Sequence, residues 1–384
     1  ALLTFEYEGR RLRFRLPRKA QASGIAGVAR SGKVNRLIGA AMTAGAVGSG
    51  LGRGVDSGSV AGLDTGSRAG SGDGGGFTDA EYKLAGTNAA SATNALVAEA
   101  LAQGDLGLAV ATLAPLSVLR ALVTWGDAEQ QATYLPAFSE LQPPVSALAL
   151  AEPGLLSDAM QPQTRAERTE LGYRLHGEKS LVIRGAEAEL LLVSAQVPGE
   201  GTALFVIEGG TPGIQFAPEP TMGLRAAATV RMTLDAVEVP MTARLGTAED
   251  AADCVRLSRL AWCAVACGTS RAVLDFVIPY VNERQAFGEP ISHRQSVAFS
   301  VADMAIELEG MRLAMLRAAS RAETGQSFAR EVALARRLCA DKGMQIGSDG
   351  VQLLGGHGFT KEYPVERWYR DLRAIAVMDG GLLV

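Results

Sequence analysis

The sequence predicts a multidomain α+β protein in which a segment of short strands lies between two helical segments. Its 384 residues exceed the size of one ordinary domain, so two or three compact units are expected. Helical hydrophobic patterning covers residues 77–146 and returns over residues 246–384, while residues 147–245 carry short alternating runs. This order predicts an N-terminal helical domain, a middle antiparallel β domain and a C-terminal helical bundle.

Two segments precede the first helical domain. Residues 1–38 open with apolar and charged residues alternating around Gly9, which predicts a small β-hairpin. Its polar face sets Glu6 against arginines such as Arg11, so ion pairs between the strands are expected. Residues 39–76 are more than one third glycine and have no hydrophobic period, which is typical of a flexible linker or loop.

The patterning also predicts individual elements. Helices of the first domain are expected at 79–101, 106–123 and 127–138. Asp127 is a suitable N-cap for the last of them. Strands of the middle domain are expected within 173–177, 190–195, 203–208 and 229–239. In the last domain, steps of four and three residues put one apolar stripe on a bundle helix. The stripe consists of Val297, Val301, Met304, Leu308, Met311 and Met315.

Composition and spacing exclude several classes of protein. The net charge of −4 argues against a surface for polyanions, so no nucleic acid partner is expected. No run of about 20 apolar residues occurs, and the longest candidate, 106–119, contains Pro115, so no transmembrane segment is predicted. The three histidines lie far apart, so no metal site is predicted. Four cysteines without paired spacing and the lack of a signal-peptide pattern predict a cytoplasmic protein with reduced thiols.

The most specific motifs lie in the last third of the chain. They are RQAFG at 284–288, QLLGGHGF at 352–359 and YPVERWYRD at 363–371. Weaker motifs lie in the β segment, with AEPGLLSD at 151–158 and HGEKSLVIRG at 176–185. In order and separation this set resembles the acyl-CoA dehydrogenase family. The resemblance covers about residues 74–384 and leaves the first 73 residues without a counterpart.

The resemblance implies an architecture and a reaction. An N-terminal α-helical domain, a β-barrel-like middle domain and a C-terminal four-helix bundle would together bind FAD. The subunits would form a homo- or hetero-oligomer, a dimer or tetramer, in which a neighbour's bundle completes the flavin site. The implied reaction is α,β-dehydrogenation of an acyl-CoA or another acyl thioester, with a carboxylate as base and the flavin as hydride acceptor. An electron acceptor such as an electron-transfer flavoprotein would then reoxidise the flavin.

The resemblance also assigns a base. The family usually has YEGT where this chain has Met378-Asp379-Gly380-Gly381, so the implied catalytic residue is Asp379, whose side chain is one methylene shorter. A base displaced by about 1 Å can lose on the order of a hundredfold in rate, unless the backbone moves to compensate. Some family members carry the base on the helix of Arg259 instead, but the neighbouring residue here is Ser258. The alternative for Asp379 is an exposed carboxylate near a flexible C-terminus.

Further residues are assigned by the same matches. The resemblance implies that the adenosine diphosphate part of FAD is contacted across the subunit interface by Arg284, Phe287 and Gln295. It implies that a glycine-rich turn approaches the same cofactor with Gln352, Gly355 and Gly356. Ser157 matches a serine near the phosphates of flavin and CoA, and Arg259 matches an arginine beside the acyl-CoA. The alternative for this group is ordinary bundle packing and surface charge.

Three departures from the family pattern surround the expected flavin ring. Ala151, Leu181 and Ile183 stand where the family usually has Thr, Trp and Thr, so an aromatic ring and two hydroxyl donors are absent. These departures leave two other hypotheses open. The chain could be a catalytically weak structural subunit that pairs with a competent relative, or a related flavin oxidase that acts on a substrate other than a thioester.

Overall fold

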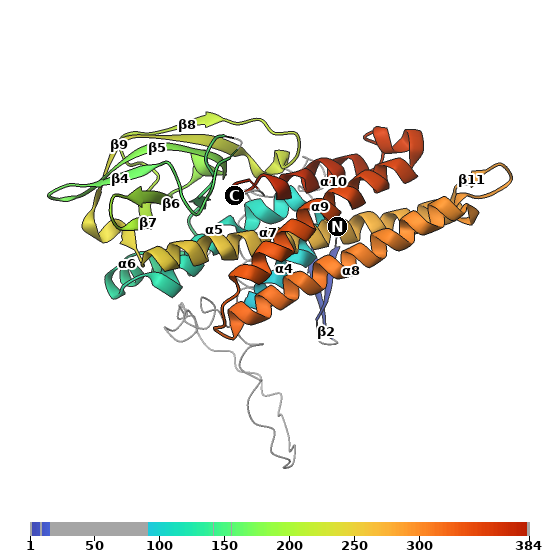
Figure 1. Cartoon of the computed structure of the whole chain (residues 1–384), viewed down its shortest axis with the longest axis horizontal. Coiled ribbons are helices and arrows are strands. Elements are labelled where there is room, and N and C mark those ends of the chain that lie inside the picture. Colours follow the sequence, from blue (N-terminus) through green and yellow to red (C-terminus); the bar gives the residue numbers. More distant parts are fainter. Residues whose placement is uncertain (1, 8–9, 16–90, 141, 155, 382–384) are drawn as a thin grey trace, which may run out of the picture.

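A computed structural model describes residues 2–7, 10–15, 91–140, 142–154 and 156–381. Helices and one large sheet share the described part of the chain, with the sheet at one end of a long helical bundle (Figure 1). The glycine-rich segment 39–76 and the first half of the helix expected at 79–101 lie outside the described residues.

The predicted N-terminal hairpin is confirmed. Strands β1 (Leu2–Tyr7) and β2 (Arg10–Arg15) pair antiparallel, and their register sets Glu6 opposite Arg11. The ion pairs expected between these strands stay a prediction.

Three helices form the described part of the N-terminal domain: α4 (Ser91–Gly104), α5 (Leu106–Trp125) and α6 (Ala128–Phe138). The side chain of Asp105 caps α5 by accepting a hydrogen bond from the amide of Leu108 at 2.9 Å. Asp127 caps α6 as predicted, and its capping box with Gln130 satisfies the free amides at both positions.

Two helices, α5 and α7 (Ala248–Glu283), are long and apolar enough to cross a membrane by length and composition alone. The first of them continues through Pro115 for 20 residues, beyond the apolar run that the sequence suggested. Packing against other parts of the protein buries 61% of the apolar window in α5 and 72% of that in α7. Both therefore have the environment of core helices, which accounts for their apolar composition.

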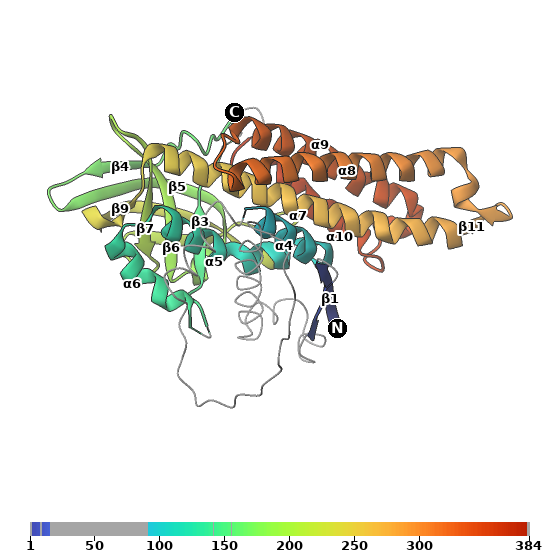
Figure 2. The same cartoon turned by 90° about the horizontal axis from the view of Figure 1, so that it is seen from below.

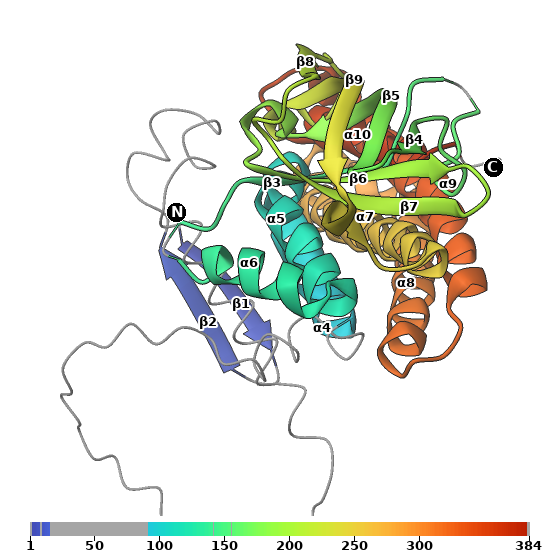
Figure 3. The same ribbon diagram turned by 90° about the vertical axis from the view of Figure 1, so that its left-hand side faces the viewer.

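The middle domain is an eight-stranded sheet (Figure 3). Seven strands follow the order β10-β7-β6-β4-β5-β9-β8, and β3 pairs with β6 outside this path. Its strands are β3 (Ser146–Ala149), β4 (Arg165–Arg168), β5 (Gly172–Ile183), β6 (Leu190–Val197), β7 (Gly201–Glu208), β8 (Ile214–Pro218), β9 (Thr229–Pro240) and β10 (Arg244–Leu245). The prediction of an antiparallel sheet holds for most neighbours and fails for β3 and β4, which run parallel to β6. Long connections allow this pairing, because a chain that crosses over before returning can run in the same direction.

The C-terminal domain is a bundle of α7 with α8 (Gln295–Glu323), α9 (Ala329–Leu353) and the short α10 (Val365–Leu372), as Figure 2 shows from below. Within the predicted stripe on α8, Met304, Leu308, Met311 and Met315 are buried, and its first two valines are partly buried against the same core. Helix α4 packs on α7 so closely that a Cβ at Gly268 would lie 1.9 Å from the carbonyl oxygen of Glu99. A glycine is therefore required at this crossing.

The prediction of unpaired thiols is confirmed. All four cysteines are free and buried: Cys254, Cys263, Cys267 and Cys339.

Candidate active site

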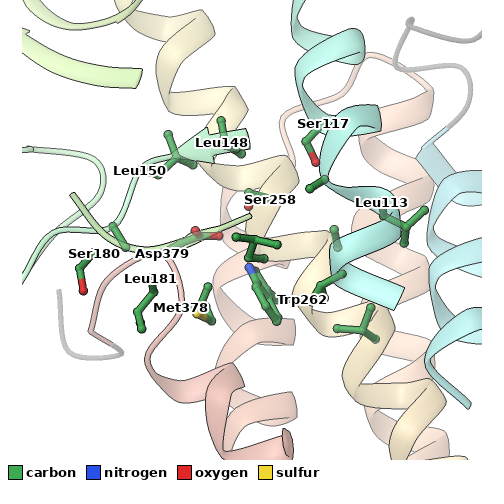
Figure 4. A pocket seen from close by; sticks show the side chains of 16 residues that line it. Leu113, Ser117, Leu148, Leu150, Ser180, Leu181, Ser258, Trp262, Met378 and Asp379 are labelled. Atoms are coloured by element: carbon green, nitrogen blue, oxygen red, sulfur yellow. The ribbon is translucent and has the colours of Figure 1, made fainter. Parts of the chain in front are cut away.

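A pocket lies where the middle domain meets the helices, and Asp379 forms part of its wall (Figure 4). Helix α5 contributes apolar side chains such as Leu113, strands β3 and β5 contribute the opposite wall, and α7 contributes Ser258 and Trp262. The C-terminal turn crosses between these elements and brings Met378 and Asp379 into the pocket. Segments more than 250 residues apart thus build one site, which the hydrophobic patterning of the sequence alone could not locate.

The turn that carries Asp379 is fixed by the backbone of a neighbouring loop. Asp379 has φ of +58° and Gly380 has φ of +96°, so the chain reverses in the left-handed region. The amide of Gly381 donates to the carbonyl oxygen of Ser157 at 2.9 Å, and Gly380 forms a β-bridge with Asp158. Asp379 is only 6% exposed, so the alternative of a solvent-exposed carboxylate is wrong.

Opposing influences act on the carboxyl group of Asp379. Burial raises its pKa above the ordinary value, because a charge is poorly solvated away from water. Hydrogen bonding from Ser258, the charges of Arg336 and Arg259, and hydrogen bonding from Trp262 each oppose this rise. The net direction is upward, and the Oδ2 atom has no hydrogen-bond partner among the described residues. The result is a buried carboxylate with a raised pKa and one oxygen that no described residue bonds.

The residues assigned to the phosphates and the acyl-CoA, Ser157 and Arg259, lie beside this turn. The Nη2 atom of Arg259 donates to the carbonyl oxygen of Asp379 at 2.9 Å and lies 3.8 Å from Asp158. The hydroxyl oxygen of Ser157 accepts a hydrogen bond from the amide of Glu152 at 3.3 Å. The structure therefore brings three predicted site residues, Ser157, Arg259 and Asp379, into one neighbourhood.

The loop that carries Ser157 is anchored by a buried ion pair. The Nζ atom of Lys179 lies 2.8 Å from Oε1 of Glu152 and donates to Ser194 Oγ at 3.1 Å. Glu152 also accepts from the amide and the hydroxyl of Thr164. Lys179 is fully buried, and its burial lowers its pKa from 10.5 to about 8. The pair ties the two ends of the loop at 152–164 to strand β5.

The three departures from the family pattern all line this pocket. Ala151, Leu181 and Ile183 present apolar groups to it, beside Ser180. The amides of Ser180 and Leu181 are both occupied, the first by the carbonyl of Ala151 at 2.9 Å and the second by Glu219 Oε2 at 2.6 Å. The wall contributed by these residues is therefore mainly apolar.

The remaining assigned residues lie at the far end of the bundle. Arg284, Phe287 and Gln295 are exposed around the small hairpin β11 (Gln285–Ala286) and β12 (Glu289–Pro290), which joins α7 to α8 (Figure 1). Phe287 is 95% exposed, with the guanidinium of Arg294 5.2 Å from its ring centre. Exposed as well, at the end of α9 and in the 3₁₀ turn Gly355–Phe359, are Gln352, Gly355 and Gly356. Within one chain these residues do not meet Asp379.

Sequence reasoning missed two residues of the site. Arg336 on α9 donates to the carbonyl oxygens of Met378 and Gly380, and nothing in its local sequence marks it. Trp262 lines the pocket one helical turn after Ser258. The spacing of four residues on α7 was a usable signal, because it puts both side chains on the face that carries the pocket.

Comparison with known proteins identifies this architecture. Residues 74–141, 147–237 and 248–381 match the N-terminal, middle and C-terminal domains of acyl-CoA dehydrogenase. The short/branched chain specific acyl-CoA dehydrogenase of Rattus norvegicus mitochondria is 32% identical over 79% of this chain and 72% of that protein.

Two solved structures extend the comparison. Butyryl-CoA dehydrogenase from Megasphaera elsdenii has a TM-score of 0.68 and 29% identity, covering 79% of each chain. PigA with FAD and proline has a TM-score of 0.71 and 25% identity, covering 79% of this chain and 86% of that one. The three matched domains and the identity to a curated relative agree in order and extent. The chain therefore belongs to the acyl-CoA dehydrogenase family.

Proposed function

We propose that this protein catalyses the FAD-dependent α,β-dehydrogenation of an acyl-CoA or another acyl thioester, with Asp379 as the base. The observation that carries the proposal is the buried carboxylate of Asp379, which faces the pocket with Oδ2 unpaired among the described residues. A base for carbon acids needs a pKa moved toward neutrality, and burial moves the pKa of Asp379 in that direction. Proton transfer also requires contact at hydrogen-bond range with a substrate in the pocket.

Two places in the protein fit FAD: the loop beside Ser157 and the turn at the end of α9. A Cβ at Gly154, Gly355 or Gly356 would meet nothing within 4 Å, so the backbone is open to a ligand beside Ser157 and at the end of α9. When bound, FAD supplies the hydride acceptor for the β-carbon. Leu181 and Ile183 would contact the ring, and Ser157 would contact the phosphates.

The protein's own groups position the substrate and move the proton. Asp379 Oδ2 would accept the α-proton, and Arg259 holds the backbone of this residue through its carbonyl oxygen. Apolar side chains such as Leu113 and Val265 would receive the acyl chain and exclude water from the reacting atoms. The short side chain of Asp379 requires the turn itself to lie closer to the substrate than a turn with glutamate would.

An oligomer of this chain is part of the proposal. Helix α8 exposes Phe299, Ile306 and Leu313 at intervals of seven residues, with 59%, 68% and 65% of each residue accessible in the single chain. Such a stripe on one helix face is typical of a surface that another helix covers. A second copy would cover it and could bring its own Arg284 and Gln352 to this chain's cofactor, because these residues are exposed and remote from Asp379 here.

A structural role in a hetero-oligomer is the second candidate. Three apolar residues, Ala151, Leu181 and Ile183, occupy the wall expected to hold the flavin ring, and this composition favours weaker cofactor binding. Co-purification decides between the two. A homogeneous homo-oligomer with one flavin per chain supports the enzyme, whereas a stable complex with a flavin-bearing relative supports the structural subunit. Oxygen consumption with and without CoA thioesters tests the third possibility, a flavin oxidase.

We further propose an electron-transfer flavoprotein as the electron acceptor and the cytoplasm as the compartment, in keeping with the four free, buried thiols. The first experiment is to purify the protein, record its flavin spectrum and assay acyl-CoAs of different length with an artificial electron acceptor. Bound flavin and acyl-CoA-dependent reduction are expected. A colourless protein that FAD cannot reconstitute would contradict the proposal.

A further inference from the structure

Arg336 on α9 is a buried cation without an acidic partner. It is 4% exposed, and among the described residues it forms no ion pair. Burial lowers its pKa to about 10, so the guanidinium is charged at neutral pH. A buried charge without an ion pair is unfavourable, so its hydrogen bonds must compensate for the lost water.

Those contacts are backbone carbonyls of the turn that carries the base. Arg336 Nη2 donates to the carbonyl oxygen of Met378 at 2.8 Å and to that of Gly380. Arg259 Nη2 donates to the carbonyl between them, that of Asp379, at 2.9 Å. Three consecutive carbonyls are thus held by two arginines, one from α7 and one from α9.

Neither arginine forms an ion pair with the side chain of Asp379. Asp379 has no ion pair among the described residues, and its Oδ2 has no hydrogen-bond partner there. A guanidinium bound directly to the carboxylate would neutralise its basicity. Because each guanidinium donates through Nη2 to backbone carbonyls and not to the carboxylate, both positive charges lie close to Asp379 without an ion pair to it.

The backbone of this turn needs such support. Asp379 is a non-glycine residue at φ of +58°, a conformation that persists only where surrounding contacts enforce it. This conformation turns the side chain toward the pocket while the carbonyls of its neighbours point to Arg336. Because the side chain of aspartate is one methylene shorter than that of glutamate, the position of the carboxylate depends more on the backbone.

We propose that Arg336 is a positioning residue for Asp379: it fixes the 378–380 turn so that the carboxylate faces the substrate with one oxygen free. This inference rests on the proposed function, since it assigns Asp379 as the base. Arg336 does not touch the reacting atoms, and it acts through the carbonyls of Met378 and Gly380.

The electrostatic surroundings of the base come from several elements. Charged and titratable groups that act on Asp379 or on its two arginines come from α7, α9 and the loop after β3. They are Cys254, Arg259, Cys263, Arg336 and Asp158. Removing the positive charge of Arg336 leaves one arginine near the base, so the apparent pKa of the base moves upward in the variant.

The test compares Arg336→Met with Arg337→Met in the full-length protein. Arg337 is the next residue on α9, and its side chain is exposed and bonded to Asp341 at 3.0 Å, so it is a matched control. In Arg336→Met, anaerobic reduction of the flavin by an acyl-CoA is expected to slow about a hundredfold, which is the usual effect of a base displaced by about 1 Å. KM should change less than threefold, and the acidic limb of the pH–rate profile should move to higher pH. Arg337→Met should behave as wild type.

Hydrogen exchange gives a second measurement that needs no substrate. The amide of Gly381 is bonded to Ser157, so its exchange reports whether the turn is held. Exchange in the peptide containing residues 374–381 should rise in Arg336→Met and stay unchanged in Arg337→Met. If no acyl thioester reduces the flavin of the wild type, the proposed dehydrogenation fails. The difference in exchange between the two variants still decides whether Arg336 holds the turn.

Arg336→Gln replaces the methionine variant if that variant does not fold, because it removes the charge and keeps an N–H donor. It is expected to slow flavin reduction at least tenfold, and Arg336→Lys to retain more activity than either. A wild-type rate, pH profile and exchange in the Met or Gln variant would overturn the inference.

Discussion

The guanidinium of Arg259 donates to the main-chain oxygen of Asp379 at 2.9 Å, although 120 residues separate them in the sequence. The bond joins the long core helix α7 to the C-terminal turn. It uses the carbonyl and leaves the carboxylate free, so the same arginine supports the base without forming an ion pair with it. This relation positions a buried acid and leaves its carboxylate for the proposed proton transfer.

Substitution of Asp371 by asparagine should change how stability depends on pH. Asp371 is 3% exposed, and its Oδ1 accepts from the amide of Leu224 at 2.7 Å. Burial raises its pKa from 3.8 to about 6. Between about pH 4 and 6 the folded state therefore holds a proton that the unfolded state has lost, and the free energy of unfolding falls as pH rises.

Asp371→Asn keeps an oxygen acceptor for Leu224 and removes the buried charge. We expect this variant to be more stable than wild type at pH 7, by up to about 3 kcal/mol, and to show a flatter dependence between pH 4 and 6. Urea unfolding at a series of pH values measures the free energy of unfolding of both proteins and its pH dependence. Asp341→Asn, at an exposed ion pair with Arg337, is the control. The account of Asp371 is wrong if its variant and wild type have the same slope.

Loss of the buried cation Lys179 should destabilise the middle domain. Lys179→Met leaves the carboxylate of Glu152 buried without its positive partner, 2.8 Å away in the wild type. A broken buried pair usually lowers the free energy of unfolding by about 3–5 kcal/mol. Lys342→Met, at the partly exposed pair with Glu307, should lower the free energy of unfolding much less, because solvent screens that pair.

Chemical denaturation compares the two lysine variants. Because Glu152 closes the loop that carries Ser157, we also expect Lys179→Met to retain less FAD after gel filtration. A loss of stability below 1 kcal/mol in Lys179→Met would contradict the assignment of this pair as an anchor.

Much of the fold could be predicted from the sequence because local patterns determine it. The cap at Asp127 and the apolar stripe from Met304 to Met315 depend on spacing within one helix, and the structure has both. The parallel pairing of β3 with β6 could not be predicted, since it depends on which distant strands meet. An alternating pattern is the same in both strand directions.

The candidate site was only partly predictable for the same reason. The motif around Asp379 marks a candidate base, but the burial of this residue depends on contacts with α5, α7 and α9 that no local pattern encodes. Arg336 resembles any other arginine on a helix in the sequence. Only the fold reveals that its guanidinium meets the carbonyls of residues 42 and 44 positions away.

The exposed stripe of α8 predicts association of chains. Ile306 lies between Phe299 and Leu313 on that stripe and is 68% exposed in the single chain. Ile306→Glu puts a charge in the centre of the surface, so we expect smaller particles in analytical ultracentrifugation and lower FAD retention. Arg168→Glu, at an exposed position on β4 in the middle domain, is the control. An Ile306→Glu protein with the wild-type sedimentation coefficient would contradict the placement of the interface.

We expect Asp379 to remove the α-proton of an acyl thioester in a flavin-dependent oxidation. The most direct measurement is anaerobic mixing of the FAD-loaded protein with butyryl-CoA and longer acyl-CoAs, followed by the loss of oxidised flavin absorbance. Wild type should bleach with at least one of these substrates, and Asp379→Asn should bind the same amount of FAD but reduce it at least a thousandfold more slowly, a loss of about 4 kcal/mol in transition-state stabilisation. Equal rates of bleaching in the two proteins would contradict the role of Asp379.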